Sequence, residues 1–202
     1  MNERQENNAQ DRMDQELVNR TLAGDGRAFE KLVEKYKKRV YYLAYRMTRD
    51  HDSADELAQE SFVKAYQALG NFKPGYNFYT WIYRICVNLS INFLKKESHT
   101  VSADHLRELN QLPERSPEID QLERMITSEQ AGIVRRALDT LPPDQRSAFI
   151  LKTYDNLSYE QMAEIMECSI GTVMSRLFRA RQKLKNALKA AEAERDDVDG
   201  KL

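Results

Sequence analysis

Apolar residues recur every three or four positions along most of this chain, which is the spacing that places them on one face of an α-helix. The clearest stripe contains Leu32, Tyr36, Val40 and Leu43 and predicts a helix over residues 28–47. Further helices are predicted from similar stripes at residues 14–23, 54–69, 78–96, 122–138, 144–154, 158–166 and 170–188. No segment alternates apolar and polar residues in the way that a half-buried strand requires. The pattern therefore predicts an all-α protein.

A polar stretch interrupts this helical pattern near the middle of the chain. Residues 97–121 contain six acidic residues together with Pro113 and Pro117, and they offer little apolar surface to bury. We therefore expect two small helical domains joined by a flexible acidic linker. The predicted division is a disordered tail at 1–13, a first domain at 14–97, a linker at 98–121, a second domain at 122–190 and an acidic tail at 191–202.

The charges are distributed unevenly, although the formal net charge is only −1. Residues 61–96 contain no Asp or Glu, but they contain five basic residues and nine aromatic residues. Residues 168–191 also lack acids and contain six basic residues. Basic windows in an otherwise acidic chain suggest that each half faces a polyanion such as nucleic acid.

Composition excludes several other classes of protein. No run of 18 apolar residues is present, so the sequence predicts no membrane span, and the polar first residues predict no secretory signal. The two cysteines, Cys86 and Cys168, form no disulfide framework or zinc motif, and packing roles are expected for both. A reducing cytoplasm is the expected location.

The second half contains the pattern of a helix-turn-helix. Ser158 and Gln161 fit a capping box at the start of a short helix, and a turn of about three residues precedes the next helix near Ile170. Apolar residues from Val173 to Leu188 form the buried stripe of that second helix. Polar side chains suited to DNA contact fall on its other side, namely Thr172, Ser175, Arg176, Arg179 and Gln182. The alternative is a basic, solvated helix in an ordinary bundle.

The aromatic residues of the first half form a second candidate surface. Tyr79, Trp81 and Tyr83 accompany Arg84, Asn88 and Asn92 along one helix, an arrangement that can stack unpaired bases. The alternative is that Trp81 and Tyr83 pack between helices. Phe72 and Lys73 are stronger candidates, because loops hold core residues less often.

Acidic residues at 50–60 surround His51 and raise the alternative of a metal site. One histidine gives weak support for metal, and acids in the first turn of a helix are favourable without any ligand. The row formed by Asp55, Gln59 and Phe62 fits a protein-binding surface better. The three scattered histidines supply no catalytic cluster, so we expect no metal, no cofactor, no catalytic residues and no enzymatic activity.

Three segments together resemble a bacterial RNA polymerase sigma factor of the extracytoplasmic-function group, of the sigma-E type. They are DELAQESFVKAYQAL (residues 55–69), NFYTWIYRICVN (77–88) and the run from LPPDQRSAF to RARQKL (141–184). The resemblance implies sigma region 2 in the first domain and region 4 in the second.

What the resemblance implies can be assigned position by position. Binding of core polymerase at the clamp helices of its β′ subunit involves a row on region 2 formed by Asp55, Gln59, Glu60 and Phe62, and the β flap is a further expected polymerase partner. Binding and melting of the −10 element involves Lys64, Phe72, Lys73, Trp81, Tyr83, Arg84, Asn88 and Asn92. Reading of the −35 element involves Gly171, Thr172, Ser175, Arg176, Phe178, Arg179 and Arg181.

The resemblance also implies partners and regulation. The implied partners are promoter DNA and an anti-sigma factor, which is often membrane-bound. The anti-sigma factor holds the sigma factor inactive at the inner membrane until a stress response releases it. No small-molecule substrate is implied. Met174 departs from the pattern, since many relatives have Arg or Lys there. The competing interpretation is a two-domain helix-turn-helix regulator whose first half binds a small ligand. That protein would bind its promoter tightly without polymerase.

Overall fold

The structure is a computed structural model that describes residues 2–73, 75–100 and 128–199, and all regular structure in these ranges is helical. The first half contains α1 (Asn2–Leu22), α2 (Gly26–Thr48), α3 (His51–Gln67), the 3₁₀ turn η1 (Leu69–Asn71) and α4 (Phe78–Thr100). The second half contains α6 (Ser128–Asp139), α7 (Pro143–Thr153), α8 (Tyr159–Ile165) and α9 (Ile170–Asp199). The all-α prediction is confirmed.

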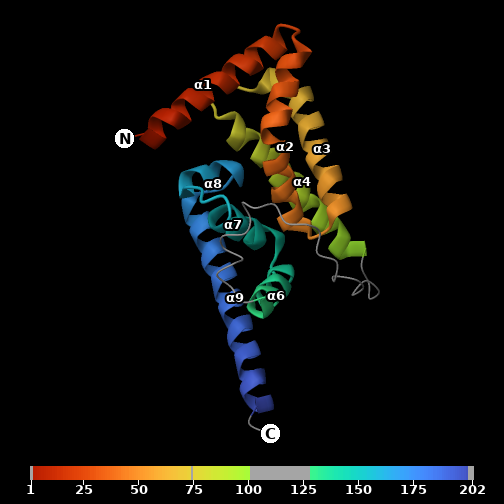
Figure 1. Cartoon of the computed structure of the whole chain (residues 1–202), viewed down its shortest axis with the longest axis vertical. Helices are drawn as coiled ribbons and strands as arrows, with labels where there is room; N and C mark the ends of the chain where they lie inside the picture. Colours follow the sequence, from red (N-terminus) through yellow and green to blue (C-terminus); the bar gives the residue numbers. More distant parts are fainter. Residues whose placement is uncertain (1, 74, 101–127, 200–202) are drawn as a thin grey trace.

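In the first half, α2, α3 and α4 pack against one another, and α1 runs obliquely across one end of this bundle (Figure 1). The break between α2 and α3 is fixed locally. Arg49 ends α2 in the left-handed conformation, with φ of 65°, and the Asp50 side chain then caps α3 by accepting from the Ser53 amide at 2.7 Å. These two residues return the chain so that the apolar stripes of α2 and α3 meet.

The second half has the predicted helix-turn-helix in α8 and α9. The capping box is present, since the Gln161 amide donates to the Ser158 hydroxyl at 3.2 Å and the Ser158 amide donates to the Gln161 side chain at 3.0 Å. Glu167 turns the chain at a positive φ of 49° before α9 begins. The predicted stripe of α9 is buried at Val173, Leu177, Ala180 and Leu184.

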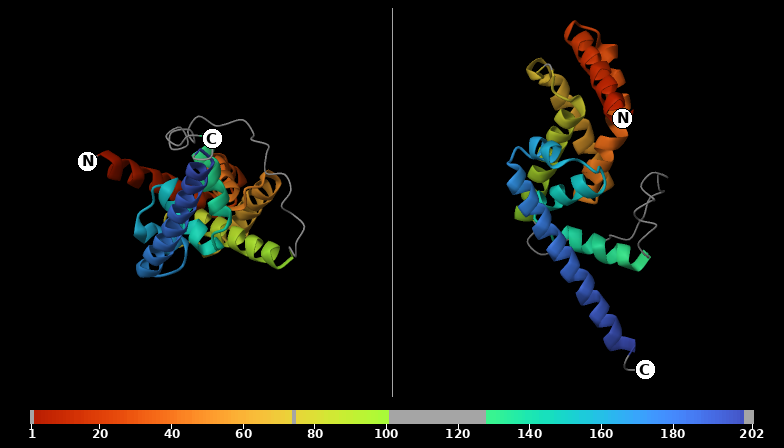
Figure 2. Two further views of the ribbon diagram at one scale, coloured as in Figure 1. Left: turned by 90° about the horizontal axis from the view of Figure 1, so that it is seen from below. Right: turned by 90° about the vertical axis from the view of Figure 1, so that its left-hand side faces the viewer.

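The two halves are docked together, with α7 and α8 lying beside α4 and with α7 reaching the end of α2 (Figures 1 and 2). One cluster of buried side chains continues from the first half into the second, where it includes Ile150, Met162 and Val173. The buried Arg146 of α7 donates to the Met47 carbonyl at 2.6 Å. The sequence pattern did not predict this docking.

Three other features differ from the sequence-based expectations or lie outside the residues that can test them. Residues 2–13, predicted to be disordered, form the first part of α1, and α9 continues through most of the predicted acidic tail to Asp199. α4 continues to Thr100, and the predicted linker lies almost wholly outside the described residues. The domain limits as a set remain a prediction. In the described part of the chain, none of the helices combines the length and apolarity needed to cross a membrane.

Removing the α8 cap should destabilise the helix-turn-helix. We expect Ser158→Ala to lower the free energy of unfolding by about 1 kcal/mol, because the Gln161 amide loses its acceptor. Urea denaturation followed by circular dichroism measures the change. Ser175→Ala, which removes an exposed hydroxyl inside α9, should change the stability by less than about 0.5 kcal/mol. Equal losses from both variants would contradict a specific role for the cap.

Candidate nucleic-acid and protein interfaces

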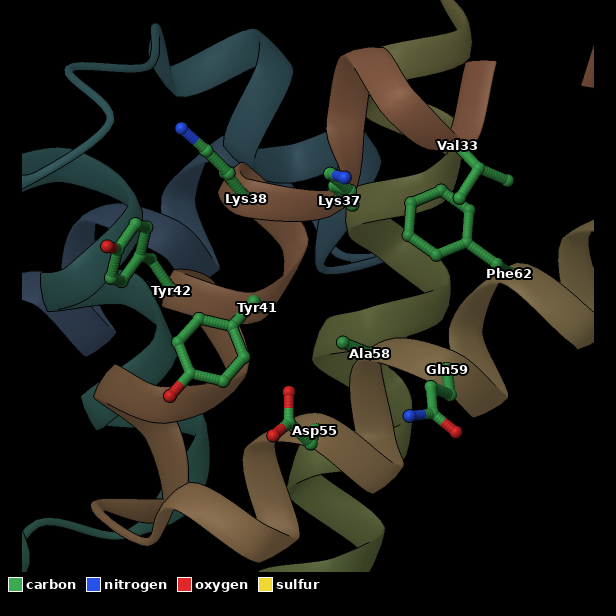
Figure 3. A pocket seen from close by; sticks show the side chains of 9 residues that line it. All are labelled: Val33, Lys37, Lys38, Tyr41, Tyr42, Asp55, Ala58, Gln59 and Phe62. Carbon is green, nitrogen blue, oxygen red and sulfur yellow. The ribbon is translucent and has the colours of Figure 1, made fainter. Parts of the chain in front are cut away.

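A groove of about 400 Å³ lies between α2 and α3. α2 contributes Val33, Lys37, Lys38, Tyr41 and Tyr42, and α3 contributes Asp55, Ala58, Gln59 and Phe62. Figure 3 shows the Asp55 carboxylate pointing toward the Tyr41 ring, with Lys37 and Lys38 further along α2. The lining is thus largely apolar, with ionic groups of both signs around it. Such a surface suits a helical protein partner better than a small substrate.

Three of the four predicted polymerase-binding residues line this groove. Asp55, Gln59 and Phe62 lie four and three positions apart on α3, which places them on one face of the helix. The fourth, Glu60, is not among the lining residues, and its carboxylate pairs with Lys64 at 3.3 Å. Sequence reasoning missed the α2 side of the groove, because a helix stripe does not reveal which neighbouring helix completes the surface.

A second, smaller pocket of about 130 Å³ lies where the loop after η1 meets α4. The residues that line it are Asn71, Phe72, Lys73, Tyr76, Trp81 and Arg84. Four of the eight predicted −10 residues therefore meet here. Tyr76, 51% exposed, was missed, although the loop argument that favoured Phe72 applies equally to it.

The expectation that a loop position leaves the Phe72 ring free is wrong. Phe72 is only 6% exposed, and its ring packs 5.1 Å from that of Trp81 and 6.0 Å from that of Phe78. It forms part of the pocket wall, whereas Lys73 beside it is exposed. Two other predicted −10 residues are separate from the pocket lining, since Lys64 lies on α3 and Asn92 lies further along α4.

The remaining −10 residues lie under the second half of the molecule. The Tyr83 hydroxyl donates to the Asp155 carboxylate at 3.1 Å, and Tyr83 is completely buried. Asn88 donates to Glu167 at 3.2 Å, and Arg84 pairs with the same carboxylate at 3.6 Å. The alternative that Tyr83 packs between helices is therefore confirmed. The carboxylates of Asp155 and Glu167 therefore cover this part of α4.

Asp155 is the most strongly buried carboxylate of this interface. Desolvation raises its pKa, while Arg46, the Tyr83 hydroxyl and Arg39 act in the opposite direction. Burial also raises the pKa of Tyr83, and the charge of Asp155 adds to that effect. The docked arrangement therefore favours the protonated form of both groups.

The outward face of α9 remains open in the docked molecule. Ser175, Arg179 and Arg181 are exposed, and Phe178 is 63% exposed. Arg176 is held within its own half, where it pairs with Asp144 at 3.4 Å and donates to the Cys168 sulfur at 3.6 Å. Arg179 and Arg181 are thus better placed than Arg176 to reach DNA without loss of an internal contact.

The two halves match two families. Sigma-70 region 2 matches residues 32–100, and sigma-70 region 4 matches residues 131–184. The RNA polymerase sigma-H factor of Pseudomonas aeruginosa is 38% identical over 188 residues, which cover 87% of this chain and 93% of that protein. The ECF RNA polymerase sigma-E factor of Salmonella typhimurium is 41% identical over 182 residues, which cover 86% of this chain and 93% of that protein.

Solved structures show the same fold. The sigma factor RpoE of Bartonella quintana, solved with the anti-sigma factor NepR, is 28% identical and has a TM-score of 0.60, covering 80% of this chain and 96% of that chain. CnrH, solved with the cytosolic domain of CnrY, is 24% identical with a TM-score of 0.64, covering 88% of this chain and 98% of that chain. The two regions together define the sigma-70 class of transcription factor. This chain belongs to its extracytoplasmic-function (ECF) sigma factors.

The raised pKa of Asp155 predicts that docking depends on pH. The docked form binds a proton more readily than the undocked form, so docking should be strongest below the ordinary pKa of aspartate and should weaken as the pH rises through the raised pKa. Energy transfer between a dye on α3 and a dye on α9, followed from about pH 7.5 to about pH 3.5 so that the ordinary pKa of aspartate is included, reports the distance between the halves.

The matched control is Asp155→Asn, which keeps an acceptor for the Tyr83 hydroxyl and binds no proton in this range. Its docking should be stronger than that of the wild type at neutral pH and should change little as the pH falls. A pH dependence that survives unchanged in this variant would show that another group controls docking.

Proposed function

We propose that this chain binds core RNA polymerase, directs it to specific promoters and helps to melt their −10 element. The observation that supports the proposal is the open basic face of α9 within a capped helix-turn-helix in the region-4 match. A second helix of this kind enters the major groove, where Arg side chains bind guanine edges and phosphates. Ser175, Arg179 and Arg181 are the contacts that the geometry favours for the −35 element.

The groove between α2 and α3 is the proposed contact with polymerase. Its apolar lining supplies the buried centre of a protein interface, and Asp55 and Gln59 supply polar contacts at its edge. A helix of the partner laid along the groove would cover the half-buried Tyr41 and Tyr42. The proposed partner helix belongs to the clamp of the β′ subunit.

The pocket before α4 is the proposed receptor for an unstacked −10 base. Trp81 and Tyr76 offer ring faces, and Lys73 and Arg84 offer positive charge for the adjoining phosphates. The surface formed by Tyr83, Arg84 and Asn88 continues from this pocket along α4. Because Asp155 and Glu167 cover it, region 4 has to leave α4 before the melted strand binds there.

This requirement also accounts for the proposed regulation. A docked sigma factor can present α9 to duplex DNA, but it would not bind the melted −10 strand until polymerase separates the two regions. The Bartonella quintana relative was solved with an anti-sigma factor, and we propose that an anti-sigma factor holds this chain inactive in the cytoplasm during unstressed growth. The proposal includes no catalytic residue, metal or cofactor.

Reconstitution with core polymerase tests the function. The template is a promoter recovered by mapping the start sites of the reconstituted enzyme. Asp55→Ala combined with Gln59→Ala should weaken binding to core polymerase about ten-fold, since both side chains line the groove. Arg179→Ala should leave core binding unchanged and lower run-off transcription about ten-fold, by loss of one base contact.

Each variant serves as the control for the other. A third variant, Lys31→Ala, removes an exposed cation of α2 that lies outside the α2–α3 groove, the −10 pocket and the open face of α9. Lys31→Ala should behave as the wild type in both assays. Wild-type protein that binds core polymerase but starts no RNA chain at any template would refute the proposed function.

Reversing one charge of the docked interface should expose the −10 surface. In Glu167→Lys the new cation faces Arg84, so we expect docking along α4 to weaken and the isolated protein to bind forked −10 DNA several-fold more tightly. Glu164→Lys makes the same charge change at an exposed position of α8 and controls for general attraction to DNA. Equal gains in the two variants would contradict masking by region 4.

A further inference from the structure

The N-terminal helix reaches the loop that leads into α4. Asn77 immediately precedes α4, and its side-chain oxygen accepts from the Thr80 amide at 3.3 Å, which caps the helix. The side-chain amide of Asn77 donates to the Asp11 carboxylate of α1 at 2.6 Å. One side chain therefore joins α1 to the beginning of α4. Asp11 lies outside the part of the chain that the region-2 family matches.

Asp11 is held in place by the residues that follow it in α1. Asp14, one turn later, is 1% exposed and accepts hydrogen bonds from Lys35 and from the Tyr36 hydroxyl of α2. Val18, another turn later, is completely buried. These residues share one face of α1 because their spacing is three and four. The Asp11 carboxylate is thus presented to Asn77 by a helix whose packing is already fixed.

Packed aromatic rings connect Tyr36, which holds Asp14, to the pocket. Tyr36 packs 5.6 Å from Phe78, and Phe78 packs 5.7 Å from Trp81, which lines the pocket. The ring of Phe72 lies against both Phe78 and Trp81. The loop between Phe72 and Asn77 is therefore held at its first end by rings and at its second end by Asp11.

We propose that Asp11 is a positioning residue for the −10 pocket. It does not line the pocket, but through Asn77 it contacts the end of the loop whose Lys73 and Tyr76 do. Without this contact Asn77 is held only by α4 itself, through the Thr80 amide and the Trp81 amide, and Gly75, at a φ of 88°, gives the loop before it a flexible point. The pocket then has to be ordered when the base arrives, which slows promoter opening. This inference rests on the proposed function.

An exchange of the two side chains tests the contact. Asn77→Asp keeps an oxygen that caps Thr80 but sets a second carboxylate against Asp11, so the bond is replaced by repulsion. Asp11→Asn alone keeps an acceptor for the Asn77 amide. The double variant restores a bond of the opposite direction, since the new amide at position 11 donates to the new carboxylate at position 77.

The readouts separate binding from opening in the reconstituted holoenzyme. Retention of duplex promoter in a gel measures closed-complex formation, and fluorescence of 2-aminopurine in the −10 element measures opening. We expect Asn77→Asp to slow opening about ten-fold, the change that about 1.4 kcal/mol makes, with closed-complex affinity unchanged. Asp11→Asn and the double variant should open the promoter within about two-fold of the wild-type rate.

Two results would overturn the inference. Opening at the wild-type rate in Asn77→Asp would show that the loop needs no anchor at this end. Slow opening that the double variant fails to restore would assign the effect to Asn77 alone. Asp11→Ala, with Arg12→Ala as its exposed neighbour, gives a second test that leaves the α4 cap intact, and it should also slow opening. Failure of the wild-type holoenzyme to open any promoter would instead refute the proposed function.

Discussion

The buried guanidinium of Arg146 joins the two halves of the molecule. It donates to the Met47 carbonyl at 2.6 Å and to the Asp139 carbonyl at 2.7 Å, near the ends of α2 and α6. Carbonyls in the last turn of a helix lack donors within that helix, so one side chain satisfies two helix ends. Burial lowers the pKa of Arg146, yet arginine stays charged in proteins, so these bonds are needed to offset its desolvation. This junction links α7 to the end of α2, beside the contacts that α7 and α8 make with α4.

The rest of the interface follows from the uneven distribution of charge. Because residues 61–96 contain no acid, Arg84 and its neighbours have no carboxylate in their own window, and the second half supplies Glu167 and Asp155. The Arg84–Glu167 pair is partly exposed, and such pairs contribute little stability, about 0–1 kcal/mol. A nucleic-acid strand presents many phosphates and can replace it. The buried contacts of Arg146 thus hold the interface at one end, whereas the partly exposed ion pair along α4 can be replaced by DNA. This combination allows region 4 to uncover α4 reversibly.

Local patterns predicted the local structure well, and contacts distant in sequence were the ones missed. The helices follow from their apolar spacing, and the cap at Ser158 follows from the presence of Gln161 three positions later. Tyr83 is buried because Asp155, 72 positions away, lies over it, and no periodicity reveals such a partner. Phe72 was misjudged although its partners are near in sequence, because the apolar stripe of the next helix does not show which loop residue packs against Phe78 and Trp81. The order of α1 likewise depends on the fit of Asp14 to α2, which composition alone does not show.

The docked structure leaves its two DNA-facing surfaces unequally available, and this sets an order of events for the proposed function. α9 packs on α6, α7 and α8 within its own half, so its outward face can meet duplex DNA while α4 remains covered. Met174 lies on that face at 52% exposure, where its thioether can pack on a thymine methyl but cannot bind a guanine as an arginine would. Duplex contact therefore requires no rearrangement, whereas strand capture requires the carboxylates of region 4 to leave α4. Polymerase, by holding the regions apart, would supply that separation, which makes promoter melting rather than promoter contact the step that the fold controls.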